Sequence, residues 1–187
     1  DMLNGRMQDA IHFGQRALTL ETKHPQPEVR VHALNNVGSA LVLRGDHSGE
    51  PLLQESLELA LKHGFHEHAA RVYTNMSDYL VRFKQLDKAE QWLTDGIAYD
   101  TEYDLDSWTY YLVGIQAQLR LAQGRLEDAA TIGRGVLALK QLTLLMQLPA
   151  LCVVAKAESR MGEPDVDHLL GLALKNAMAT NEQQYII

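Results

Sequence analysis

The residues best able to do chemistry gather in one short segment, His63-Gly64-Phe65-His66-Glu67-His68. Imidazole nitrogens and carboxylate oxygens bind zinc, so this segment could hold a metal ion. A structural zinc site, however, requires four well-placed ligands. His63 falls at the predicted end of a helix, where the helix dipole favours a positive side chain, and His66 and His68 follow in a turn and at the next helix start. We therefore predict no metal site and no cofactor.

Sequence motifs that mark enzymes are absent. The chain has no phosphate-binding glycine loop, no G-x-S-x-G, no zinc-protease motif and no CxxC pair. We interpret Asp104 and Asp106 as turn and cap residues. The single cysteine, Cys152, excludes an internal disulfide, fits a reducing compartment and has no nucleophile motif around it. The sequence predicts a cytoplasmic protein that is not an enzyme.

A short motif that opens with glycine or lysine returns at a nearly constant interval. Its five lead residues are separated by 40, 39, 40 and 38 positions, and they are Gly5, Gly45, Lys84, Gly124 and Gly162. Seven residues before each of the last four stands a small residue: Gly38, Ser77, Ala117 and Ala155. Such a period predicts a solenoid. Small residues allow two helices to approach closely, and a lead residue seven places later ends the helix in a tight turn.

The apolar residues recur with helical spacing, and no stretch alternates like a strand. The predicted helices cover 6–21, 27–44, 49–63, 67–83, 86–99, 105–123, 126–139, 148–161 and 164–178, with a last helix opening near 181. Four prolines fall in the first turn of a predicted helix, where the missing N–H costs nothing; they are Pro27, Pro51, Pro149 and Pro164. We expect no proline inside a helix.

The second full unit resembles the tetratricopeptide repeat. It reads Tyr73-x2-Met76-Ser77-x2-Leu80-x8-Ala89-x3-Leu93-x2-Gly96-Ile97, the alternation of large and small residues typical of that family. The resemblance implies an all-α, right-handed superhelix of antiparallel helix pairs, here about four and a half repeats of about 39 residues. The expected single domain comprises a partial repeat 1–25, repeats 26–65, 66–103, 104–142 and 143–179, and the start of a further helix at 180–187.

Three phrases are similar to a narrower family, the helical-repeat region of bacterial regulators in which a signal-transduction ATPase is joined to repeats and often to a LuxR-type helix-turn-helix. They are Ala33-Leu34-Asn35-Asn36-Val37-Gly38, Glu67-His68-Ala69-Ala70-Arg71-Val72-Tyr73-Thr74-Asn75 and Asp104-Leu105-Asp106-Ser107-Trp108. This resemblance implies signal transduction and transcriptional regulation. The chain opens within a unit, and the capping box Thr180-Asn181-Glu182-Gln183 announces another helix, so we expect a fragment of a longer protein.

The charge of the chain disfavours nucleic acid and anionic membranes as partners. With 17 basic and 24 acidic residues, the formal net charge is −7, whereas phosphate binding rests on clustered lysine and arginine. The sequence also has no run of the ~18 apolar residues that a membrane-spanning helix needs. Proteins or peptides are therefore the expected partners, together with other domains of the parent chain and a second copy bound through the exposed end helices.

The resemblance to the tetratricopeptide repeat implies that the first helix of each unit lines a concave groove. Counting from the small residue of each first helix selects groove-facing positions that include His32, Asn35, Ser39, Arg71, Thr74, Asp78, Tyr111, Gln118 and Lys156, with Arg82 and Arg160 beside them. The basic members favour an acidic or C-terminal peptide. We expect a non-catalytic interaction module; the alternative is a domain that senses a small-molecule inducer. A peptide needs an open polar groove, whereas a metabolite needs a closed pocket.

Overall fold

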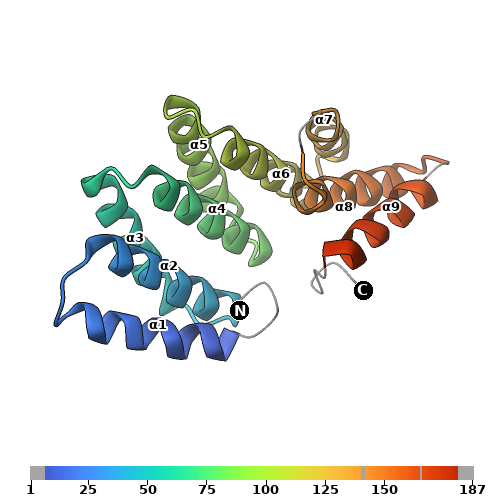
Figure 1. Cartoon of the computed structure of the whole chain (residues 1–187). Coiled ribbons are helices and arrows are strands. Elements are labelled where there is room, and N and C mark those ends of the chain that lie inside the picture. Colours follow the sequence, from blue (N-terminus) through green and yellow to red (C-terminus); the bar gives the residue numbers. More distant parts are fainter. Residues whose placement is uncertain (1–6, 140–141, 165, 181–187) are drawn as a thin grey trace.

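The computed structural model describes residues 7–139, 142–164 and 166–180, and these residues form nine α-helices and no strand. The helices follow one another through short connections (Figure 1). Their bounds are α1 Met7–Glu21, α2 Pro27–Leu43, α3 Gly49–His63, α4 His66–Arg82, α5 Leu86–Glu102, α6 Asp106–Ala122, α7 Leu126–Leu137, α8 Leu144–Met161 and α9 Val166–Thr180. The prediction of an all-helical chain is confirmed.

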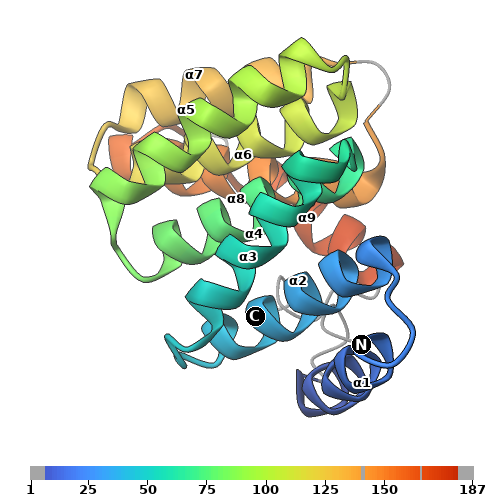
Figure 2. The ribbon, with the colours of Figure 1, turned by 90° about the vertical axis from the view of Figure 1, so that its left-hand side faces the viewer.

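The helices pack as successive neighbours, with a second set of contacts between alternate helices. Each helix contacts the next along the chain, and α2, α4, α6 and α8 also contact one another in that order. Figure 1 shows the progression from α1, in blue, to α9, in red, at the opposite end of the molecule. In Figure 2, α3 packs across α2 and α4, as its contacts require. The even-numbered helices thus form a continuous row.

The turns at the predicted lead positions share one backbone conformation. Gly45, Gly124 and Gly162 have φ angles of 81°, 78° and 81°, and Lys84 has a φ of 60°. In each turn the next residue donates its N–H to a carbonyl near the end of the preceding helix, as Gln85 does to Leu80 at 2.9 Å. This bond satisfies a helix carbonyl that would otherwise lack a partner. The predicted tight turns at these four positions are confirmed.

The small residue of each even-numbered helix lies where little space is left for a side chain. A Cβ added to Gly38 would lie 2.9 Å from the carbonyl oxygen of Gly49 and 2.9 Å from Cγ of Leu53, both on α3. Its counterparts are Ser77, Ala117 and Ala155, and all three are buried. Close packing of this kind leaves little room for a larger side chain.

Most predicted helix bounds agree with the structure within three residues, but the start of α8 was predicted wrongly. α8 begins at Leu144, where Thr143 Oγ1 accepts a hydrogen bond from the backbone N–H of Met146 at 3.3 Å. Pro149 therefore lies inside this helix, against expectation. Proline is costly inside a helix, because it lacks an N–H and its ring meets the preceding turn; Pro149 is buried and lies beside Gly114 of α6.

Two further predicted features reach beyond the described residues. α9 begins at Val166, after Pro164 and the undescribed residue 165, rather than at 164. Gly5, most of the predicted capping box and the predicted last helix near 181 lie outside the described residues. Across the part of the chain that is described, no helix combines the length and apolar character needed to cross a membrane.

The left-handed turn at Lys84 gives a direct test of this backbone geometry. A side chain with a Cβ is strained at positive φ, so Lys84→Gly should raise the free energy of unfolding by about 1 kcal/mol. Lys88, also exposed but inside α5, is the matched control. Lys88→Gly should lower that free energy by about 0.5–1 kcal/mol, because glycine weakens a helix. Urea unfolding measures both, and a loss of stability for Lys84→Gly would contradict the assigned turn.

Candidate functional site

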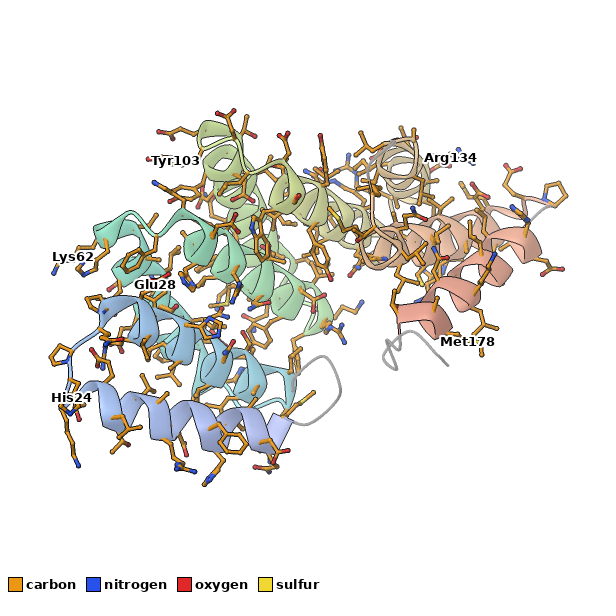
Figure 3. The ribbon with its side chains drawn as sticks, viewed as in Figure 1. His24, Glu28, Lys62, Tyr103, Arg134 and Met178 are labelled. Carbon is orange, nitrogen blue, oxygen red and sulfur yellow. The ribbon has the colours of Figure 1, made fainter. Side chains whose placement is uncertain are left out.

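A hollow of about 1230 Å³ lies along the N-terminal halves of α2, α4 and α6, with α1 at one side. Its apolar wall consists of Ala10, Phe13 and Ala17 on α1 and Val29 on α2. Its polar floor consists of His32 and Asn35 on α2 and of His68, Arg71 and Thr74 on α4. Trp108 and Tyr111 of α6 close the far side. Figure 3 shows the side chains, with Glu28 at the end of α2 that follows the linker carrying His24.

The polar floor arises because equivalent positions of successive even-numbered helices come side by side. Asn35 and Thr74 each stand three residues before the small residue of their helix, and His32 and Arg71 stand six before it. Residues three or four apart share one face of a helix. Since α2 and α4 are in contact, the two faces combine into one surface.

Arg71 connects the floor to the α6 side of the hollow. Its Nη1 donates to Nδ1 of His32 at 3.0 Å, and its guanidinium lies over the Trp108 ring, 5.8 Å from the ring centroid. The indole Nε1 of Trp108 donates to Oε2 of Glu67 at 2.6 Å. Burial lowers the pKa of His32, and the nearby Arg71 and His68 lower it further. His32 is therefore neutral at pH 7, and its Nδ1 accepts the hydrogen bond from Arg71. The contacts with His32 and with the Trp108 ring together hold the Arg71 side chain in place.

Three buried polar atoms of the floor lack hydrogen-bond partners among the described residues. They are Nδ2 of Asn35, Oγ1 of Thr74 and Nδ1 of His68. Oδ1 of Asn35 accepts a hydrogen bond from Nδ2 of Asn75 at 3.0 Å, and Nε2 of His68 lies 3.4 Å from Oε1 of Glu28. The side chains of Asn35 and His68 are therefore fixed by these second polar atoms. A buried polar group without a partner costs about 1–3 kcal/mol. These atoms are themselves closed to solvent, so the group that the floor offers to a partner is the Arg71 guanidinium.

Four of the predicted groove residues line this hollow, and the structure places the others elsewhere. Asn35, Arg71, Thr74 and Tyr111 line it. Ser39 is buried and does not line the hollow. Asp78 and Arg82 form an ion pair with 2.9 Å between Oδ2 and Nε. The described lining of the hollow does not include these three residues, nor Gln118, Lys156 and Arg160.

Sequence reasoning missed two residues of the floor and far side, and it missed the whole contribution of α1. His68 and Trp108 each stand nine residues before the small residue of their helix. The prediction used the positions three and six residues before the small residue. Adding the position nine residues before it would have selected both. The prediction restricted the groove to first helices, whereas Phe13 of α1 is 56% exposed and lines the hollow.

The three histidines that open the sequence analysis have separate partners. His63 stacks on Phe65 with ring centroids 5.5 Å apart. His66 Nδ1 lies 2.7 Å from the hydroxyl oxygen of Tyr99, and His68 belongs to the polar floor. Among the described residues, no three His, Cys, Asp or Glu side chains converge as metal ligands would.

Cys152 lies on α8 and is partly buried. Burial raises the pKa of its thiol, although Lys156 opposes this effect. The thiolate is the nucleophilic form of cysteine, so this environment disfavours nucleophilic chemistry at Cys152.

Asp100 is a buried carboxylate near the C-terminal end of α5. Its side chain is inaccessible to solvent, and neither carboxylate oxygen has a hydrogen-bond partner among the described residues. Burial raises the pKa of Asp100 to about 7, and the negative charge of Glu67 contributes. Glu67 also accepts the hydrogen bond of the Trp108 indole, so the same carboxylate contacts the far side of the hollow and raises the pKa of Asp100.

Comparisons with known proteins give no family for this chain. A scan against protein-family models finds no match, and a search of curated proteins finds none either. The site's geometry and the sequence motifs are therefore the grounds for the function proposed below.

Asp100 should make the stability of the protein depend on pH. Its pKa rises from a reference value of 3.8 to about 7 on folding. Folding therefore favours the protonated form, and the free energy of unfolding should fall as pH rises from about 4 through 7. Asp100→Asn removes this titration and should raise the melting temperature at pH 8 but hardly at pH 4. Asp95→Asn, at an exposed site on the same helix, should show no such difference. Equal gains for Asp100→Asn at both pH values would contradict the assignment.

Proposed function

We propose that this chain is a non-catalytic interaction module that binds an extended, acidic segment of a partner protein along the polar floor. The observation that carries this proposal is Arg71, a partly exposed cation that lines the hollow and is held in place by His32 and Trp108. An acidic segment supplies carboxylate oxygens for the Arg71 guanidinium. Hydrogen bonds to charged groups are stronger than those between neutral groups.

The dimensions of the hollow favour a peptide over a small-molecule inducer. Its volume of about 1230 Å³ exceeds the ~300–1,000 Å³ of typical small-molecule pockets. Phe13 and Val29 remain 56% and 42% exposed along its wall, whereas a metabolite site buries most of its ligand. An open hollow of this size suits a chain segment that extends across three helices.

The proposal includes a finer fold and a cellular context. We infer a right-handed superhelix of about four and a half tetratricopeptide-like repeats, supported by the recurring left-handed turns and the contacts along α2, α4, α6 and α8. In such a superhelix the even-numbered helices line the concave side. The three phrases that resemble bacterial LuxR-type regulators with a signal-transduction ATPase support a cytoplasmic regulatory protein as the context.

Two charge reversals test the acidic-partner proposal. A displayed library of 12-residue peptides is selected on the protein, and the enriched acidic peptide is labelled for fluorescence anisotropy. Arg71→Glu should weaken its binding by about tenfold or more, because a charged hydrogen bond is lost and a repulsive carboxylate takes its place. Arg82→Glu is the matched control, since Arg82 lies outside the hollow and pairs with Asp78, and it should change binding less than about twofold. Equal effects of the two variants would contradict the proposed site.

Thr74→Val separates binding from folding. Valine keeps the shape of threonine but removes Oγ1, which has no partner in the described structure. The melting temperature should stay level or rise, because an unsatisfied buried polar group is removed. Binding of the same acidic peptide should change less than about twofold, because Oγ1 is closed to solvent and Arg71 is untouched. A loss as large as that of Arg71→Glu would contradict a site centred on Arg71.

A further inference from the structure

The apolar wall leaves hydrophobic side chains of two packed helices open to solvent. Phe13 on α1 and Val29 on α2 are 56% and 42% exposed, and both face the hollow together with Ala10 and Ala17. A continuous apolar surface of this kind is typical of a binding site. A second place in the same fold shows how an equivalent surface is covered.

α1 packs on α2 in the same way that α7 packs on α8. A Cβ added to Gly14 of α1 would collide with Cγ2 of Val37, and a Cβ added to Gly133 of α7 would collide with Cγ2 of Val154. In both pairs the next contact is the carbonyl oxygen four residues before the valine, at 3.6 Å and 3.5 Å. Two matching contacts fix the register, so residues of the two helix pairs can be equated.

In the α7–α8 pair, the surface equivalent to the apolar wall lies beneath α6. α6 contacts both α7 and α8. The α7 residues that correspond to Ala10, Phe13 and Ala17 are Ala129, Ile132 and Val136. Ala129 and Ile132 share an apolar cluster with Ala117 and Leu121 of α6. On the α1–α2 pair, no described helix occupies the corresponding position.

The residue that α2 contributes to the wall also has counterparts that contact another helix. Val29 stands nine residues before the small residue of its helix, as His68 and Trp108 do in α4 and α6. His68 reaches Glu28 on the preceding even-numbered helix at 3.4 Å, and Trp108 reaches Glu67 at 2.6 Å. Val29 therefore occupies the position that, in the later helices, contacts another helix of the row.

We propose that the apolar wall binds an amphipathic α-helix, which takes on α1 and α2 the place that α6 takes on α7 and α8. The bound helix runs beside α2. It carries a small residue where it crosses α1, as α6 carries Ala117 where it crosses α7. One turn later it carries an apolar residue that covers Phe13. Asn36 also lines the hollow and corresponds to Asn75, whose Nδ2 donates to Asn35 at 3.0 Å. The occupant accordingly presents a hydrogen-bond acceptor to Asn36. This helix site is separate from the acidic-segment site on the polar floor.

A synthetic peptide with the sequence of α6, residues 106–122, is the probe for this site. Labelled peptide is titrated with the 187-residue chain and followed by anisotropy and circular dichroism. Saturable binding with a gain of helix is expected. Phe13→Asp should weaken binding by at least about tenfold, because burial of a large apolar side chain is lost. Leu20→Asp is the matched control, since Leu20 is 59% exposed on the same helix but lies outside the hollow, and it should have less than about a twofold effect.

Two further measurements keep the test decisive. If Phe13→Asp does not fold, as judged by its melting curve, Val29→Asp alters the same wall from α2, where an acidic residue near the helix start is favoured. A probe peptide carrying A117E should not bind, because the crossing requires a small residue. Absence of saturable binding by the unmodified peptide, or binding unaffected by either wall variant, would overturn the proposal. A dimer in sedimentation that is abolished by Phe13→Asp would also overturn it, since a second copy would then be the occupant.

Discussion

Close approach between neighbouring helices is the constraint on which the rest of the structure depends. Gly38 shows it most clearly, because the backbone of α3 lies where its side chain would be. The same position carries Ser77, Ala117 and Ala155 in the later even-numbered helices. Since each of these helices is held against its neighbours at that position, residues three, six and nine places earlier acquire fixed positions too. The hollow is built from those earlier residues, so its geometry follows from the small residues at the crossings.

The polar floor carries a cost in stability. Each unpartnered polar atom of Asn35, Thr74 and His68 costs about 1–3 kcal/mol, a large fraction of the 5–15 kcal/mol by which folded proteins are typically stable. Apolar residues at these positions would remove that cost. Costs of this kind are common at functional sites, which agrees with the proposal that a partner binds at Arg71.

We propose two kinds of recognition in the hollow, one at the apolar wall and one at the polar floor. The wall presents Phe13 and Val29 at a place where the same fold elsewhere seats a helix. The floor presents the guanidinium of Arg71, held by His32 and Trp108. A helix on the wall would lie beside α2 and would border the floor without covering α4. Occupation of one part can therefore adjust access to the other.

Sequence periodicity predicted the helices, the turns and four residues of the hollow, because these depend on local spacing. Lys84 could be aligned with three glycines only through the period, and its positive φ confirms the alignment. Pro149 was misplaced because proline is typical of the first turn of a helix, whereas α8 begins at Leu144, after the Thr143 cap. Ser39 and Asp78 were selected by the same spacing that found Arg71. Their burial and ion pairing depend on neighbours in space, so spacing alone could not separate them.

Binding of the acidic peptide at the polar floor is tested most directly by ¹⁵N nuclear magnetic resonance. The indole N–H signals of the chain's two tryptophans are recorded while the selected acidic peptide is added. Trp108 lines the hollow beneath Arg71, whereas Trp92 packs against the apolar core and lies outside the hollow. The account predicts that the Trp108 signal shifts saturably, with the affinity measured by anisotropy, while the Trp92 signal stays in place. A shift confined to Trp92, or no shift of either signal at saturating peptide, would contradict binding at the polar floor.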